Sequence, residues 1–274
     1  MPQKRMFHTG EFARLVGVNK KTLHYYDAQG IFKPDSVAAN GYRCYSSRQL
    51  ITFYMIRSLR EMGLSLEEIR SYLSARSPAG YAKLLGEQLE WLQKEIHRYT
   101  HMRHIVETQL QVLAMAEQVE CGTVFVCGLP EARLVCSETV RMADEAQEDR
   151  IVTQHVKECL AAGLNAGYPI GAMVAAEDYL TPGQEGNISY YFTRTNRSLQ
   201  SVRKAYRHLR PAGRYAATCF QGDYMDTRAA YERLRTWLSA QGIQPSGYAY
   251  EESMVEDMSA SRPEDYITRI AVKI

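Results

Sequence analysis

The chain has 274 residues, 45% of them hydrophobic and 23% charged, with a formal net charge of +2. At about 150 residues per domain, this length favours two domains of ordinary globular composition. No uncharged apolar run approaches the roughly 18 residues of a membrane helix. The start of the chain lacks the apolar stretch of a secretory signal, so we expect a cytoplasmic protein with no membrane partner.

Charge is unevenly distributed along the chain. Residues 1–78 contain 12 Lys or Arg and 6 Asp or Glu, a net charge of +6, whereas the remaining residues contain 21 and 25, a net charge of −4. Lys and Arg neutralise DNA phosphates, so a basic segment joined to an acidic one suggests nucleic-acid binding in the first segment and a different role in the second.

Two short helices are predicted near the start. Thr9 precedes apolar residues spaced three and four apart, which predicts a helix over residues 9–16. A glycine-containing turn ends it, and Asn19 caps a second helix. This arrangement is a helix-turn-helix, in which the first turn of the second helix enters the major groove of DNA. That turn holds Lys20, Lys21 and Thr22.

A hairpin and two more helices complete the basic segment. Residues 35–45 contain the turn dipeptide Asn40-Gly41 followed by residues of extended propensity, which predicts a small hairpin wing. A serine at position 46 or 47 caps a helix that ends near Met62. Residues 65–68 form a capping box that opens a further helix, ending near residue 75.

In order and spacing, this segment resembles the winged helix-turn-helix of MerR-family transcription regulators over residues 7–75. The matching blocks are Phe12-Ala13, Gly17-Val18, Thr22 to Asp27, Gly30-Ile31, Pro34, Gly41 to Ser46 and Met62 to Ile69. His24 stands where the family usually has arginine, and a histidine can still donate a hydrogen bond. The resemblance implies that promoter DNA is contacted by these residues: Thr9, Lys20, Lys21, Thr22, His24, Tyr25, Tyr26, Tyr42 and Arg43. From spacing alone, Tyr25 and Tyr26 would be core aromatics.

A long helix is predicted after the basic segment, within residues 79–120. Residues 81–119 contain no proline, and their one glycine is Gly86. A heptad seam runs through them: Leu85, Leu89, Leu92, Ile96, Tyr99, Arg103, Val106, Leu110 and Leu113. Such a seam predicts a coiled coil and therefore a homodimer. The resemblance implies that the two helices pair antiparallel.

Two patterns in the sequence suggest metal ligands: a histidine cluster and the cysteines. His97, His101 and His104 share one helix face, but no carboxylate or thiolate at suitable spacing completes a site, so we favour a solvated or packing face. The six cysteines are Cys44, Cys121, Cys127, Cys136, Cys159 and Cys219. No two are separated by only two residues, which favours reduced, mostly buried thiols. We predict no metal and no cofactor, although a metal or redox sensor that uses Cys121 and Cys127 remains an alternative.

The second segment, residues 121–274, changes to strand periodicity and contains an internal duplication. Strands, helices and strands are predicted in the same order in two passes, over residues 124–194 and 215–274. Each pass is a strand-helix-strand-strand unit, so the fold class of the whole chain is α+β. Two such units leave a groove between them, which is where we expect a ligand.

One strand of this segment carries acidic residues among aromatic ones. Strand alternation places Tyr248, Tyr250, Glu252 and Met254 on one face. Ring faces and an ionised carboxylate both attract positive charge, so this pattern outlines a cation site. Glu251 is one register step away and remains an alternative for the pocket carboxylate.

This segment is similar to GyrI-like effector-binding domains, including those of multidrug-sensing MerR regulators of the BmrR type. The similarity rests on the duplicated unit, on the acidic strand followed by Asp257, and on the terminal strand from Tyr266 to Ile270. It implies that lipophilic cationic small molecules bind to a buried glutamate, which aligns best with Glu252. The aromatic candidates around it are Tyr190, Phe220, Tyr224, Tyr248 and Tyr266.

Together these patterns predict a ligand-responsive transcription activator and not an enzyme. The resemblance implies that the protein distorts promoter DNA so that RNA polymerase holoenzyme can engage both promoter elements. Two alternatives remain: the metal or redox sensor with Cys121 and Cys127, and a GyrI-like domain with hydrolase activity.

Overall fold

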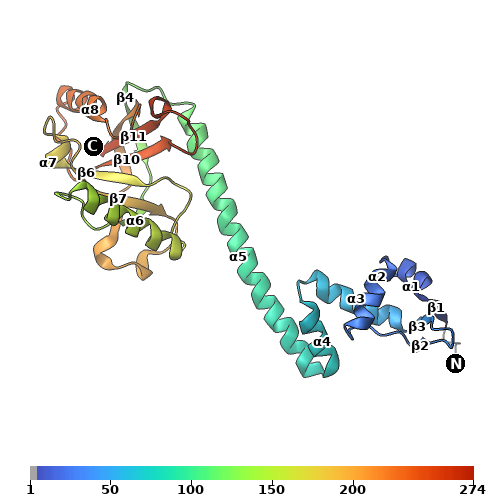
Figure 1. Cartoon of the computed structure of the whole chain (residues 1–274). Coiled ribbons are helices and arrows are strands. Elements are labelled where there is room, and N and C mark those ends of the chain that lie inside the picture. Colours follow the sequence, from blue (N-terminus) through green and yellow to red (C-terminus); the bar gives the residue numbers. More distant parts are fainter. Residues whose placement is uncertain (1–4) are drawn as a thin grey trace. The chain divides into compact units, whose positions relative to one another are not determined.

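The computed structural model describes residues 5–274 and divides into two compact units, the first ending at Arg98 and the second running from Tyr99 to Ile274. The boundary lies inside the long helix α5 (Pro78–Ala116), shown in Figure 1. The division predicted from the sequence, at residues 78 and 120, falls near the two ends of that helix and stays a proposal. Residues 5–274 form no helix with the length and apolar content that a membrane crossing requires.

The first unit is a winged helix-turn-helix. Its elements are β1 (Met6–His8), α1 (Thr9–Leu15), α2 (Lys20–Ala28), β2 (Ser36–Val37), β3 (Arg43–Ser46), α3 (Gln49–Glu61) and α4 (Leu66–Ser74), and the strands pair in the order β1-β3-β2. The predicted helices and wing are confirmed, but the predicted serine cap of α3 is wrong: the N-cap residue is Arg48, and no side chain caps the helix. Strand β1 was not predicted, because three residues with only Phe7 buried carry too little periodicity to detect.

Aromatic residues form the core of this unit. Phe12 stacks on Tyr45 with ring centroids 4.9 Å apart, and Phe32 stacks on the same ring at 5.6 Å. Phe53 packs edge-on against Phe32. Leu23 is fully buried in this cluster, so it anchors α2 and fixes which face of that helix points outward.

Helix α5 keeps an apolar stripe exposed along its length. Leu89, Ile96 and Leu110 of the predicted seam are each more than half exposed. By contrast, Val112 and Ala116, near the end of the helix and within the second unit, are buried in a cluster with Cys219 and Met254. A continuous exposed stripe on a 39-residue helix is typical of a helix that pairs with a partner.

The second unit is one antiparallel sheet of eight strands with helices. Its elements are β4 (Val124–Leu129), β5 (Ala132–Cys136), α6 (Glu145–Ala161), β6 (Gly171–Ala175), α7 (Ala176–Tyr179), β7 (Ile188–Thr195), β8 (Arg207–Arg210), β9 (Gly213–Gln221), α8 (Arg228–Ala240), β10 (Tyr248–Val255) and β11 (Ile267–Lys273), with short 3₁₀ turns at Leu199–Ser201, Lys204–Tyr206 and Pro263–Asp265.

The strand order confirms the predicted duplication, but each unit has one strand more than predicted. The order β4-β5-α6-β6-β7 recurs as β8-β9-α8-β10-β11, and β8 precedes the predicted second pass. The strands lie in the order β4-β9-β11-β10-β6-β7-β5-β8. Read from the opposite edge, this order is unchanged when β4 is exchanged with β8, β9 with β5, β11 with β7 and β10 with β6. The two halves therefore meet at the pair β6 and β10, at the centre of the sheet, and β4 and β8 cross over to lie beside the other half.

The strand register defines two faces of the sheet. Tyr191, Ala172, Glu251 and Ile270 lie opposite one another across four strands and point to one side, here called the helix face. Helices α6 and α8, both labelled in Figure 1, pack on this side. Their neighbours in sequence point to the other side, here called the open face, and the end of α5 packs against part of it.

Candidate functional site

The outward face of α2 carries the predicted DNA-contacting residues. Lys20, Lys21 and His24 are exposed, and Tyr25 is 51% exposed. The side chain of Asn19 caps the helix by accepting a hydrogen bond from the Thr22 N–H at 2.8 Å. Positive and hydrogen-bonding groups thus project from the first turns of a helix whose opposite side is anchored in the core, as major-groove binding requires.

The wing is joined to α2 by an ion pair that sequence reasoning missed. The Arg43 guanidinium donates to Asp27 Oδ2 at 2.7 Å, and this hydrogen bond raises the pKa of Arg43. Thr9 donates its hydroxyl to the Arg43 carbonyl at 3.4 Å, while Tyr42 near the wing tip is 62% exposed. Tyr26 is half-buried. The structure therefore brings all nine predicted DNA residues onto α1, α2 and the wing.

Glu251 lies on the helix face of the second unit without a cationic partner among residues 5–274. It is 8% exposed, and Tyr231 on α8 donates its hydroxyl to Oε1 at 2.6 Å. Burial raises the pKa of Glu251 from 4.5 to about 7, with the Tyr231 hydrogen bond acting in the opposite direction. A carboxyl group in this setting changes its charge near neutral pH.

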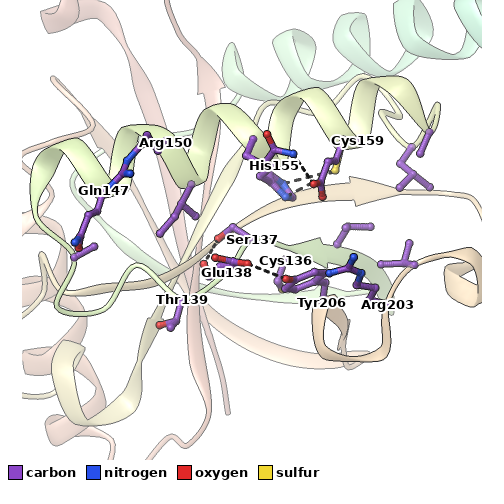
Figure 2. A pocket seen from close by; sticks show the side chains of 18 of the residues that line it. Cys136, Ser137, Glu138, Thr139, Gln147, Arg150, His155, Cys159, Arg203 and Tyr206 are labelled. Atoms are coloured by element: carbon purple, nitrogen blue, oxygen red, sulfur yellow. Dashed lines mark hydrogen bonds between the residues drawn. The ribbon is translucent and has the colours of Figure 1, made fainter.

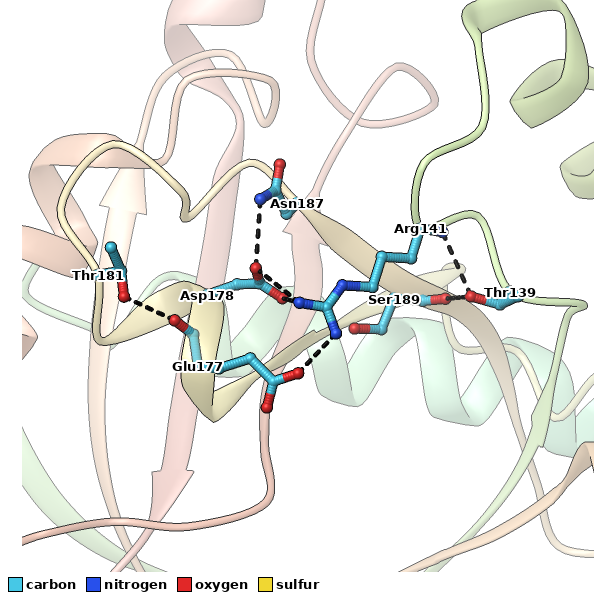
Figure 3. A network of polar contacts seen from close by, with 7 residues as sticks. All are labelled: Thr139, Arg141, Glu177, Asp178, Thr181, Asn187 and Ser189. Atoms are coloured by element: carbon cyan, nitrogen blue, oxygen red, sulfur yellow. Dashed lines mark hydrogen bonds and ion pairs between the residues drawn. The ribbon is translucent and has the colours of Figure 1, made fainter.

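The position of Tyr231 is supported by α7. Tyr179 stacks on it with ring centroids 6.2 Å apart. Figure 3 shows how α7 is held: Arg141 donates to Glu177 at 2.6 Å and to Asp178 at 3.2 Å. Asp178 is 2% exposed, so this ion pair fixes α7 and the ring of Tyr179 over the helix face.

The five predicted aromatic ligand residues divide between the two faces of the sheet. Phe220 points to the helix face by its register with Thr268, and beyond it Tyr224 stacks on Tyr266 with ring centroids 5.9 Å apart. Tyr190 and Tyr248 lie instead on the open face, edge to face at 6.1 Å. The aromatic residues therefore do not form one cage.

Glu252, the predicted pocket carboxylate, lies on the open face among three arginines. Its Oε2 accepts from Arg269 at 2.6 Å and from Arg210 at 2.9 Å, and Arg194 lies 3.7 Å from Oε1. Burial alone would raise the pKa of Glu252, but Arg269 and Arg210 outweigh it, and the pKa is lowered. The charge balance thus favours Glu251 over Glu252 as the carboxylate that could neutralise a bound cation.

A large cavity lies between α6 and residues 135–143 and 201–206, with a volume of about 780 Å³. Figure 2 shows His155 and Cys159 on α6 facing the segment from Cys136 to Thr139. The Cys159 sulfur lies 3.8 Å from Nε2 of His155, but burial raises the pKa of this thiol and lowers that of the imidazole. Cys159 is therefore not an activated nucleophile.

The cysteines of the alternative sensor lie near the end of α5 and on β4. Burial raises the pKa of both Cys121 and Cys127, so each is a protonated thiol at neutral pH. His104, from the histidine face of α5, contacts Asn196. Within residues 5–274 no group of three or more His, Cys, Asp or Glu is placed to hold a metal ion.

Sequence reasoning missed Tyr231 and the three arginines around Glu252. Tyr231 occupies the inward face of an amphipathic helix, where aromatic residues normally only pack. Arg194 is the one charged residue of β7, and Arg269 is the one charged residue of β11 before Lys273, which is the signal that could have indicated them. The sequence does not show which strands are neighbours, and without the strand order these arginines cannot be placed together around Glu252.

Comparisons with known proteins agree with this architecture. Residues 7–76 match the family described as "MerR HTH family regulatory protein", and residues 53–108 match "MerR, DNA binding". The chain is 28% identical to the Multidrug-efflux transporter 2 regulator of Bacillus subtilis (strain 168), over 99% of this chain and 97% of that protein.

Two solved structures are also similar. MtaN, the N-terminal part of the Bacillus subtilis multidrug transporter activator, is 30% identical over 38% of this chain and 97% of its own, with a TM-score of 0.34. The regulator in the EcmrR-DNA complex is 22% identical over 98% of this chain and 100% of its own, with a TM-score of 0.42.

The winged helix-turn-helix, its basic outward face and the family matches define a DNA-binding transcription regulator with a C-terminal effector domain. The chain belongs to the MerR family of helix-turn-helix regulators.

Proposed function

We propose that the chain is a homodimeric transcription activator that responds to lipophilic cations bound in its second unit. The observation that carries this proposal is Glu251, a buried carboxyl group with no cationic partner among the described residues. Its surroundings include Tyr231, Tyr179 and Tyr191, which offer ring surfaces to an organic cation. The full-length similarity to a multidrug-efflux transporter regulator supports the same ligand class.

Binding of a cation would favour the ionised form of the Glu251 carboxyl group. With a pKa of about 7, Glu251 in the free protein is partly protonated at neutral pH. A cation that displaces the Tyr231 hydroxyl stabilises the ionised carboxylate in a low-dielectric environment. The ligand therefore binds one arrangement of α8 and the sheet more tightly than another, as any ligand-driven switch requires.

DNA distortion is the proposed output. The exposed seam of α5 would pair two copies of the chain, and each copy would present its α2 and wing to one half of the promoter. Phosphate contacts would offset the energy of bending and untwisting the DNA, so that RNA polymerase holoenzyme engages both promoter elements.

Rhodamine 6G, a fluorescent lipophilic cation, tests the assignment of Glu251 in the full chain. At pH 8 we expect Glu251→Gln to weaken dye binding at least tenfold, because the counter-charge is removed. Glu264→Gln makes the same charge change at a side chain that is 77% exposed and should bind like the wild type. Equal affinities for the Glu251→Gln variant and the wild type would refute the proposal.

The two alternatives are tested with the same dye. A protein with both Cys121→Ser and Cys127→Ser should keep its full response to the dye, whereas a lost response would favour a metal or redox sensor.

We also propose that binding occurs without catalysis. Dye recovered from the protein should have unchanged mass, and a hydrolysed product would favour the hydrolase.

A further inference from the structure

A second cavity lies on the open face of the sheet, on the side opposite Glu251. Its volume is about 470 Å³, within the range of small-molecule sites. One wall is formed by the end of α5, through Val112, Met115 and Val119. The other is formed by strands, with Phe125, Phe192 and Met254 among the apolar side chains that line it.

The charged residues in the wall of this cavity carry an excess of positive charge. Arg194, Arg210, Arg269 and Glu252 are its charged lining residues, with a formal sum of +2. Their side chains are 17%, 1%, 16% and 12% exposed, so water screens them poorly. Burying a charge without a partner is unfavourable, and one carboxylate cannot neutralise three guanidinium groups.

Hydrogen-bond donors are also left over. Within the described part of the chain, Nε and Nη2 of the fully buried Arg210 have no acceptor, and neither has Nε of Arg269. Arg194 stacks over the ring of Tyr168 at 4.1 Å, which fixes its orientation at the cavity wall. Guanidinium groups arranged in this way are suited to bind carboxylate or sulfonate oxygens in pairs.

We propose that this cavity binds an aromatic or lipophilic organic anion, with its carboxylate or sulfonate held by Arg194, Arg210 and Arg269 and its apolar body packed between α5 and the sheet. The anion supplies the negative charge that Glu252 alone does not. This site is separate from the cation site proposed at Glu251, and it does not depend on that proposal.

The aromatic sulfonate 1-anilinonaphthalene-8-sulfonate, whose fluorescence rises in apolar surroundings, is the probe for the full-length protein. We expect saturable binding that Arg194→Gln weakens at least tenfold. Arg214→Gln makes the same charge change at an exposed residue of β9 outside the cavity, so it should bind the probe like the wild type. Identical affinities for the Arg194→Gln variant and the wild type would overturn the proposal.

Glu252→Gln should change the affinity for the sulfonate in the opposite direction, and it distinguishes this anion site from a cation site at Glu252. Removing the competing carboxylate should strengthen binding of the sulfonate several-fold, whereas a role of Glu252 as an anchor for cations predicts weaker rhodamine 6G binding and no gain for the sulfonate. If Glu252→Gln does not fold, Arg269→Lys tests the same point: it keeps the charge, loses the paired donors, and should weaken sulfonate binding several-fold. Unchanged binding in that variant would count against the site.

Discussion

Glu251 and Glu252 are neighbours on one strand, yet the structure gives them opposite electrostatic environments. Glu251 points to the helix face, where its hydrogen-bond donor is the neutral hydroxyl of Tyr231. Glu252 points to the open face, where Arg269 and Arg210 donate to it. The pKa of Glu251 is raised to about 7 and that of Glu252 is lowered, although both side chains are largely removed from solvent. Partners, and not burial alone, decide which carboxylate is ionised.

The comparison separates two tasks that a glutamate can perform in a binding domain. Glu252 holds arginines in place and is a fixed anion. Glu251 can gain or lose its proton near neutral pH, so it is suited to respond to an incoming cation.

Glu252→Gln should produce the largest loss of stability. Removing one partner from a buried ion-pair cluster typically lowers the free energy of unfolding by about 3–5 kcal/mol, because the arginines are left without a counter-charge. Urea unfolding at pH 7 measures this loss, with Glu264→Gln as the exposed control. A loss below about 1 kcal/mol would mean that the arginines do not depend on Glu252.

Glu251→Gln should have the opposite effect, and only at higher pH. Because the folded-state pKa of about 7 lies above the ordinary value of 4.5, the folded wild type binds more protons between these values and loses stability as the pH rises from 4.5 to 7. Each pKa unit corresponds to about 1.4 kcal/mol, so the variant should be more stable than the wild type by about 3 kcal/mol at pH 8.

Unfolding at two pH values isolates this effect. The advantage of Glu251→Gln at pH 8 should be nearly absent at pH 4.5, where the wild-type carboxyl is already mostly protonated. A difference that is the same at both pH values would show that the substitution acts through packing and not through charge.

The sequence predicted the fold more fully than the site, and β10 shows why. Helix caps and heptad spacing are local, so the helix-turn-helix, the long helix and the duplicated strand pattern were all predicted. The assignment of Glu252 rested on aligning one acidic strand, and a single step in register moves a side chain to the opposite face. The choice between Glu251 and Glu252 depends on which strands adjoin, because Arg269 and Arg210 come from β11 and β8.

Tyr231→Phe should increase the difference in pKa between Glu251 and Glu252. The lost hydroxyl lowers the pKa of Glu251 in the wild type, so its removal should raise that pKa and shift rhodamine 6G binding to higher pH. We expect a loss of about 1–2 kcal/mol in unfolding free energy and dye binding weakened several-fold at pH 7. Dye titrations from pH 6 to 9 measure the shift. Tyr206→Phe, which removes an exposed hydroxyl bonded to Glu138, should leave the pH profile unchanged.

Asp27→Asn removes a carboxylate–arginine ion pair near the surface, the same kind of pair that Glu252 makes in the second unit. It should have the smallest effect on stability. Asp27 and Arg43 are 19% and 39% exposed, so solvent screens their ion pair and its loss should cost less than about 1 kcal/mol. The freed Arg43 and the lost negative charge should strengthen binding to duplex DNA a few-fold, because one more guanidinium can meet a phosphate. Fluorescence anisotropy with a labelled duplex at low salt measures this change. Weaker binding would instead show that Arg43 must be held by Asp27 to position the wing, which would make this pair a structural counterpart of Glu252 and its arginines.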